Sequence, residues 1–232
     1  MCLVMAESGA DIVSIHLAGD PLQAELEQAI QSVGRKCTGF ECDVSDSAAL
    51  RATFRAIWDA GIIPDILLNC AGLNRRGPIE EMTDEKIDLV FAVNLKGSYV
   101  AAQAFGQQLI NLNRPGKIIN IASFTSFVAM TNVSAYAATK GGVLQMTKAF
   151  SNEWARHGIQ VNCIAPGYIR TPLTQKLLDD FPEMEEYIVK RTPAGRWGNP
   201  ADLRGVVMFL ASRASDFVTG TSIVVDGGMM FR

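Results

Sequence analysis

The chain alternates short apolar runs with longer amphipathic stretches, and this alternation constrains its fold more than any other feature. The strand candidates are residues 11–17, 37–42, 65–68, 117–122, 160–165 and 222–225. Several of them, such as 66–68 and 118–121, are almost continuously apolar, which is typical of strands covered on both faces. Strands that alternate with helices favour right-handed crossovers. The sequence therefore predicts an α/β fold with a doubly wound, parallel, Rossmann-like sheet.

The longest predicted helices span residues 84–111 and 134–157. Thr83 is a suitable N-cap for the first, because acidic residues follow it at the positive end of the helix dipole. Asn199 and Pro200 predict a further helix start. The sequence contains no repeat, charged block or low-complexity linker, and 232 residues is a common length for one α/β domain. We therefore expect a single domain over residues 1–232.

The composition gives no support for a nucleic-acid, membrane or metal partner. A net charge of -3 gives no indication of a nucleic-acid or membrane partner. The five cysteines show no C-x-x-C spacing and there are only two histidines, so we expect no metal centre and reduced thiols in the cytoplasm. No apolar run reaches the roughly 18 residues of a membrane span, and the start of the chain is not a signal peptide. The partner expected is a small-molecule substrate.

Ligands of doubly wound sheets bind at the carboxyl ends of the strands, so chemistry is expected there. Tyr136 and Lys140 lie one helical turn apart, so they share one helix face. A free tyrosine has a pKa of roughly 10, which a nearby cation lowers. The pair is therefore suited to moving a proton to or from a substrate hydroxyl. The spacing alone is common by chance, and the alternative is two side chains on a helix surface.

Other polar or small residues follow the predicted strands. Ser123 could donate a hydrogen bond to a reacting carbonyl oxygen, or it could simply form a turn. Asn69 to Gly72 are small enough to let a flat ligand approach the backbone, although an ordinary strand-to-loop turn would have the same sequence. Asp43 could accept a hydrogen bond from an adenine amino group, or it could cap a helix.

Together these residues resemble the classical short-chain dehydrogenase/reductase family, and the resemblance runs from residue 1 to about residue 228. It implies an NAD(P)-dependent oxidoreductase that interconverts a secondary alcohol and a ketone. Further motifs that carry it are Asn94 within residues 93–97, Pro166 and Gly167, Ile169, Thr171, and residues 225–228.

The resemblance implies a role for each matching residue. Tyr136 is the general acid/base, and Lys140 lowers its pKa and binds the nicotinamide ribose. Ser123 polarises the substrate oxygen, and Asn94 holds a water in the proton relay. The residues implied at the cofactor are Asp43, Val44, Asn69, Ala71 and Gly72 beside adenosine, and Pro166, Gly167, Ile169 and Thr171 beside the nicotinamide carboxamide. The two long helices imply a homotetramer or homodimer, although their apolar faces could instead only cover the sheet.

The sequence departs from the family at its start. The family opens with a strand and a glycine-rich turn that lays the pyrophosphate on a helix N-terminus. Residues 1–8 resemble the end of that helix, and residue 11 leads into the family's second strand. The chain is either a truncated version of a normal enzyme or a short form that binds the dinucleotide poorly. In both cases we expect the first strand to be lacking, a gap lined by unpaired backbone groups, lower stability and weak catalysis.

Cofactor choice depends on the end of the first predicted strand. NAD-preferring members of the family place an acidic residue there, where this chain has His16. No arginine stands beside it to bind a 2′-phosphate, which favours NAD over NADP. His16 could also be a strand-end residue without a ligand.

Residues 71–76 and 193–198 resemble the sugar-acid branch of the family, the 2-deoxy-D-gluconate 3-dehydrogenases, also called 2-dehydro-3-deoxy-D-gluconate 5-dehydrogenases. An arginine can grip a carboxylate in bidentate fashion, so Arg75, Arg76 or Arg196 is expected to hold an acidic sugar, with Ser123 and Tyr136 at its reacting oxygen. The alternative is a surface arginine paired with Glu80 or Glu81.

Two other functions stay open. A 3-oxoacyl reductase acts on an acidic carrier, which the mild acidity of this chain disfavours. A cofactor-deficient, non-catalytic subunit is disfavoured by the intact set of Asn94, Ser123, Tyr136 and Lys140. A mobile substrate lid is implied over residues 171–190.

Overall fold

The computed structural model describes residues 1–231, and side chains as far as residue 230. All six predicted strands are present within one or two residues of the expected bounds. They are β1 Ile12–His16, β2 Cys37–Glu41, β3 Ile66–Asn69, β4 Gly116–Ile121, β5 Ile159–Pro166 and β6 Ser222–Val225. Every strand pair is parallel. The predicted α/β architecture with parallel strands is therefore confirmed.

The strands form two separate parallel sheets, β1-β2 and β3-β4-β5-β6. Within residues 1–231, β1 and β3 are not joined by ladder hydrogen bonds, so each has one unpaired edge. The residues of β3 are only partly buried, whereas β4 is buried from Gly116 to Asn120. β3 is as apolar as β4 and differs in having this open edge. The gap expected from the missing first strand is thus present.

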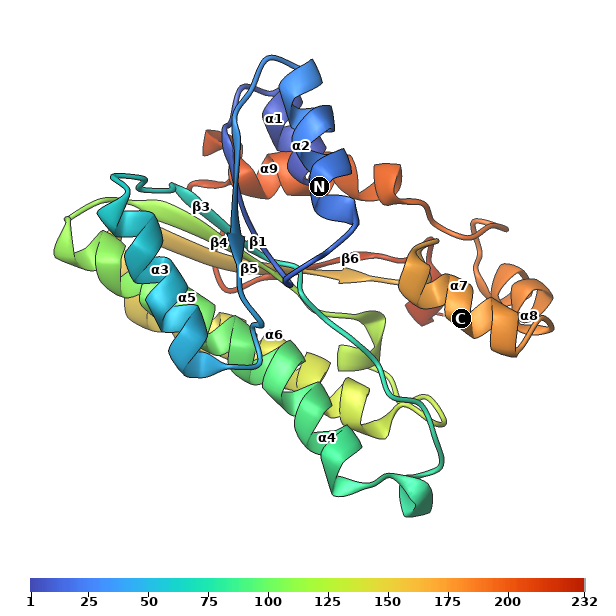
Figure 1. The fold of residues 1–232 in the computed structure, drawn as a ribbon. Coiled ribbons are helices and arrows are strands. Elements are labelled where there is room, and N and C mark those ends of the chain that lie inside the picture. The colour runs from blue at the N-terminus through green and yellow to red at the C-terminus, as the bar shows by residue number, and fades with distance from the viewer. Residues whose placement is uncertain (232) are drawn as a thin grey trace.

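Helices cover both faces of the strands (Figure 1). On one face lie α1 Cys2–Glu7, α2 Leu22–Ser32 and α9 Arg204–Ala211, and on the other lie α3 Ser47–Asp59, α5 Ser98–Asn111 and α6 Ser134–Trp154. Beyond the sheet stand α7 Pro172–Asp180 and α8 Met184–Arg191. In the described part of the chain, no helix has the length and apolar character that a membrane span requires.

The predicted helix over residues 84–111 is interrupted, which the sequence did not indicate. Residues Asp84–Phe91 form α4, Ala92–Gly97 form a wider π-helical turn, and α5 follows. A Cβ atom at Gly97 would lie 2.8 Å from the carbonyl oxygen of Val44. Only glycine therefore lets this turn pack against the loop that follows β2. The predicted cap is confirmed, because the Thr83 hydroxyl accepts the Lys86 N–H.

Candidate active site

The carboxyl end of β4 and the start of α6 bring three of the predicted residues together. Ser123 follows β4 and is buried, and its hydroxyl oxygen accepts hydrogen bonds from the Thr125 N–H at 3.1 Å and the Thr125 hydroxyl at 2.9 Å. Tyr136 and Lys140 lie on the first turns of α6, with the Lys140 Nζ 5.7 Å from the centre of the Tyr136 ring. The hydroxyls of Ser123 and Tyr136 and the amine of Lys140 therefore come from neighbouring elements at the carboxyl end of β4.

Asn94 lies in the π-helical turn and is fully buried. Its Oδ1 accepts the Leu73 N–H at 2.8 Å, and its Nδ2 donates to the Leu73 carbonyl at 2.9 Å and to the Thr139 hydroxyl at 3.2 Å. π-helical turns are frequent at functional sites. Here the turn lets one amide tie the loop after β3 to α6. Thr139 was not singled out from the sequence, because threonine is an ordinary residue inside a helix.

Lys140 is the most strongly perturbed cation of the site. Its side chain is buried and its Nζ donates to the Ile121 carbonyl at 2.6 Å. Burial penalises the ammonium and lowers the pKa of Lys140 to about 8. A Cβ at Gly72 would lie 3.4 Å from the Asn94 Oδ1 and 3.6 Å from the Lys140 Nζ. The absence of a side chain at Gly72 therefore keeps the approach to both groups open.

The pKa of Tyr136 moves in the direction opposite to our expectation. Burial raises it, a hydrogen bond with Ser123 partly offsets this, and the neighbouring Tyr168 raises it further. The predicted lowering by Lys140 is wrong for this arrangement, because the ammonium is directed at the Ile121 carbonyl rather than at the phenol oxygen. The Tyr136 hydroxyl is thus a protonated donor near neutral pH.

The residues expected beside adenosine line the ends of β1, β2 and β3. The Asp43 carboxylate accepts the Ser45 N–H at 2.9 Å, which is a local turn contact. The Asn69 Nδ2 donates to Asn120 at 2.9 Å and to the Ser98 carbonyl at 3.2 Å, so it also holds β3 in place. Ala71 is exposed in the following loop. The His16 ring lies 3.0 Å from the Leu17 carbonyl and leans over Gly39 of β2.

The residues expected beside the nicotinamide follow β5. Pro166 ends this strand, and the Gly167 N–H donates to the Val225 carbonyl at 3.0 Å. A Cβ at Gly167 would lie 2.7 Å from the Cβ of Asp226, so glycine is required for this approach. Ile169 is buried and bridges to Gly198, and the Thr171 hydroxyl caps α7. Except for the Thr171 hydroxyl, these contacts are made by backbone atoms.

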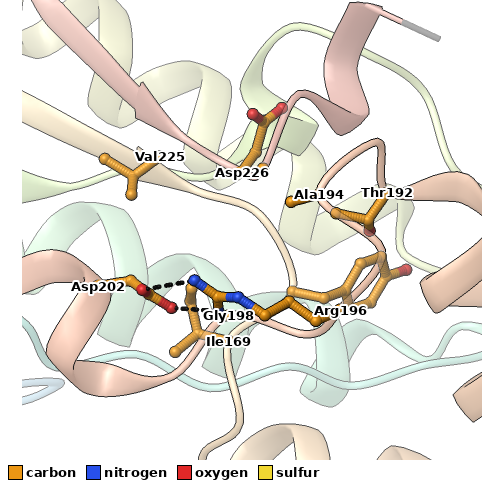
Figure 2. A pocket seen from close by; sticks show the side chains of 10 residues that line it. Ile169, Thr192, Ala194, Arg196, Gly198, Asp202, Val225 and Asp226 are labelled. Atoms are coloured by element: carbon orange, nitrogen blue, oxygen red, sulfur yellow. Dashed lines mark hydrogen bonds and ion pairs between the residues drawn. The ribbon is translucent and has the colours of Figure 1, made fainter.

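The three arginines proposed for the substrate differ in their surroundings. Arg75 and Arg76 are exposed in the loop after β3, and within residues 1–230 neither forms an ion pair, so the alternative pairing with Glu80 or Glu81 is not found. Arg196 donates to both carboxylate oxygens of Asp202, at 2.8 and 2.9 Å (Figure 2). Its guanidinium is therefore already occupied.

Sequence analysis missed Tyr168, the residue directly after Pro166 and Gly167. Its ring centre lies 5.3 Å from that of Phe124 and 5.5 Å from that of Trp197. Tyr168 also lines a pocket of about 230 Å³. Figure 2 shows other residues of this pocket, which come from the 192–198 loop and the end of β6. The available signal was a large aromatic residue placed where a strand ends beside the predicted site.

A parallel doubly wound fold with a Ser-Tyr-Lys centre and a buried asparagine defines an NAD(P)-dependent dehydrogenase acting on CH–OH groups. The family model described as "Enoyl-(Acyl carrier protein) reductase" matches residues 1–230. The chain belongs to the short-chain dehydrogenase/reductase family.

Several curated relatives are sugar-acid dehydrogenases. The 2-dehydro-3-deoxy-D-gluconate 5-dehydrogenase of Pseudoalteromonas atlantica is 40% identical over 100% of this chain and 91% of its own length. The enzyme of the same name from Escherichia coli is 42% identical over 100% of this chain and 90% of its own length.

Solved structures agree in fold. A gluconate 5-dehydrogenase from Burkholderia cenocepacia, in complex with NADP and tartrate, has a TM-score of 0.92 and 40% identity, covering 99% of this chain and 89% of the other. A putative 2-deoxy-D-gluconate 3-dehydrogenase from Agrobacterium tumefaciens with bound NADP has a TM-score of 0.90 and 39% identity, covering 99% and 90%.

Proposed function

We propose that this protein interconverts the secondary alcohol and the ketone of a sugar acid, such as 2-deoxy-D-gluconate or 2-dehydro-3-deoxy-D-gluconate. One observation carries the proposal: Arg75 and Arg76, which have no ion-pair partner among residues 1–230, lie in the loop whose Gly72 packs against Asn94 and Lys140. Both arginines thus follow within four residues of a glycine that lies against the proposed proton-transfer centre. Relatives named for gluconate derivatives support the same substrate class.

The residues present fit the nicotinamide end of the cofactor, because Gly72 keeps open the approach to Lys140. When bound, the cofactor supplies or accepts the hydride. In reduction, the Ser123 hydroxyl donates a hydrogen bond to the ketone oxygen, and Tyr136 donates its proton to the same oxygen as negative charge develops there. Lys140, whose Nζ is bonded to the Ile121 carbonyl, would bind the nicotinamide ribose, and a water at Asn94 would return the proton to Tyr136. Oxidation of the alcohol reverses these transfers.

Replacing the two loop arginines tests the substrate class. In Arg75→Ala/Arg76→Ala we expect the KM for 2-dehydro-3-deoxy-D-gluconate to rise about 10- to 100-fold, because a charge-assisted contact with the carboxylate is lost. The kcat/KM for a neutral ketose of the same length should not change. Arg213→Ala is the matched control, since Arg213 is exposed and its ion-pair partner Asp216 also binds Lys117 at the amino end of β4, opposite the strand ends that form the site. Equal losses on acidic and neutral substrates would contradict the proposal.

For the cofactor we propose NAD rather than NADP, bound weakly. A 2′-phosphate needs a cation, and residues 11–20 at the end of β1 contain no lysine or arginine. The unpaired edges of β1 and β3 support weak binding, since this is where the strands meet the dinucleotide. The NADP in the related structures favours the other choice. Fluorescence titration with NADH and with NADPH measures both affinities. Tight binding of NADPH would contradict both the preference for NAD and the weak binding.

We also propose a homotetramer or homodimer that assembles through α5 and α6. Their outer faces form a groove of about 330 Å³ that includes Tyr99, Phe150 and Trp154. Tyr99 is 45% exposed, although its ring packs against that of Phe150. Sedimentation of the protein and of Tyr99→Lys tests this: the substitution should lower the mass of the particle. A monomer at micromolar concentration would contradict it.

We also propose a single domain and a cytoplasmic location for this protein. A single domain over residues 1–232 is supported by the two apolar clusters, each of which draws residues from both sheets. A cytoplasmic location is supported by the five cysteines, all of them free.

A further inference from the structure

Tyr168 is held in place by both its backbone and its ring. The Gly198 N–H donates to the Tyr168 carbonyl at 3.0 Å, and the Arg170 N–H donates to the Gly198 carbonyl at 2.9 Å. This short bridge joins the segment after β5 to the 192–198 loop. The ring is then packed between Phe124, which directly follows Ser123, and Trp197. Both backbone and ring are therefore fixed.

The Tyr168 ring also packs against an apolar cluster that joins α7 and α8. Leu177 of α7, Ile188 of α8 and Trp197 are buried together, and Tyr168 packs against them. Phenylalanine at this position would preserve all of these apolar contacts. The hydroxyl is the one part of the side chain that this packing does not explain.

The side chain of Tyr168 lies beside the proposed site. Its ring contacts Phe124, the residue after Ser123, and it lines the same pocket as Thr192 and Arg196. The charges of the Arg76 and Arg191 guanidiniums act on its phenol. Burial raises the pKa of Tyr168 and Arg76 partly offsets this, so the group stays protonated near neutral pH. Among residues 1–230, the Tyr168 hydroxyl forms no hydrogen bond. A rigid donor thus lines the pocket next to Phe124 and Ser123, and the charge of the proposed carboxylate-binding arginine acts on it.

We propose that Tyr168 is a specificity-determining residue whose hydroxyl donates a hydrogen bond to the carboxylate of the sugar acid. The inference rests on the proposed function and adds a residue to it. Arg76 is on an exposed loop without regular structure, so it attracts the anion but orients it poorly. A donor on a fixed ring loses little entropy when it binds. Tyr168 therefore sets the distance between the carboxylate and the carbon that reacts at Tyr136.

The decisive variant is Tyr168→Phe, which removes only the hydroxyl. We expect the KM for 2-dehydro-3-deoxy-D-gluconate to rise about tenfold or more, because a hydrogen bond to a charged group is lost. The kcat at saturation should change less than threefold, and kcat/KM for a neutral ketose of the same length should not change. The melting temperature should stay the same, since no hydrogen bond within the protein is broken.

The matched control is Tyr187→Phe. Tyr187 lies on α8, also interacts electrostatically with Tyr168, and is 44% exposed. Its loss of a hydroxyl should leave the KM for both substrates unchanged. A KM change in Tyr187→Phe equal to that in Tyr168→Phe would point to a general effect of the lid and would overturn the inference.

The outcomes also separate this inference from the proposed function. If the unmodified protein uses sugar acids and Tyr168→Phe has the same KM for them, the role of Tyr168 is overturned and the proposed function stands. If Tyr168→Phe loses acidic and neutral substrates equally, Tyr168 is a packing residue only. If the unmodified protein uses neutral ketones and no sugar acid, both are overturned.

Discussion

The two sheets of this molecule differ in how completely they are built. Around β3 to β6, three of the side chains proposed to move protons, Asn94, Ser123 and Lys140, are buried. Hydrogen bonds hold them: Asn94 joins Leu73 to Thr139, and Lys140 is bonded to the end of β4. Around β1 and β2, most residues are partly exposed, and β2 has no fully buried position. The four-stranded sheet holds its functional groups by hydrogen bonds, whereas the two-stranded sheet presents mainly loops and strand ends.

The difference shows that proton transfer and dinucleotide binding depend on separate parts of this fold. Proton transfer requires a few side chains fixed within hydrogen-bonding reach, and one four-stranded sheet with α6 provides them. Holding a dinucleotide requires backbone groups presented by neighbouring strand ends. In this chain those ends lie on two sheets that share no ladder. The catalytic side is therefore expected to be intact where binding is weak.

The largest effect is expected from Tyr136→Phe, which tests the catalytic side directly. Removing the proton donor should lower kcat about 100- to 10,000-fold, as is typical when a general acid is lost. The rate of change in reduced-nicotinamide absorbance at saturating sugar acid measures it. The melting temperature should be nearly unchanged, because the ring remains. A variant that keeps more than a tenth of the activity would show that Tyr136 is not the proton donor.

Much of this catalytic side could be predicted from the sequence. Ser123, Tyr136 and Lys140 could be predicted because they match, together with Asn94, the ordered motifs of the short-chain dehydrogenase/reductase family. The six strands could be predicted from their apolar pattern. The gap between β1 and β3 was also predicted, since the strand that the family places there has no counterpart among residues 1–11.

The rest depends on contacts that periodicity does not encode. The π-helical turn at Ala92–Gly97 keeps the same apolar pattern as an α-helix, and Gly97 is needed only because Val44 approaches it. The direction of the Lys140 amine depends on the Ile121 carbonyl, so the sequence predicted the wrong sign for the pKa of Tyr136. Tyr168 acquires its position from Gly198, which is distant in sequence.

A smaller effect, on stability, compares the two sheet edges. Leu68 of β3 and Ile119 of β4 are register partners, but Ile119 is 1% exposed and Leu68 is partly exposed next to the gap. Ile119→Ala should lower the free energy of unfolding by about 3 kcal/mol, and Leu68→Ala by roughly half as much, because a partly hydrated site loses less on truncation. Urea unfolding measures both. Equal losses would mean that the edge of β3 is as well packed as the sheet interior.

The smallest effect concerns the cost of burying the Lys140 ammonium. The pKa of Lys140 is about 8 in the folded protein and has its ordinary value of 10.5 in the unfolded chain. Between pH 8 and pH 10.5 the unfolded chain therefore binds more protons, and the free energy of unfolding rises with pH. Below pH 8 both states are charged and the full burial penalty applies, on the order of 3 kcal/mol. Lys140→Met should therefore be more stable than the unmodified protein at pH 7, by that amount less the lost bond to Ile121.

The advantage of Lys140→Met should shrink as the pH rises from 8 towards 10.5, while its activity is lost at every pH. Urea unfolding of both proteins at a series of pH values gives the difference directly, because other titrating groups contribute equally to the two. A variant that is less stable at pH 7 would mean that the bond to Ile121 outweighs the burial penalty. In that case Lys140 would stabilise the folded protein, and the burial of this functional group would not lower the free energy of unfolding.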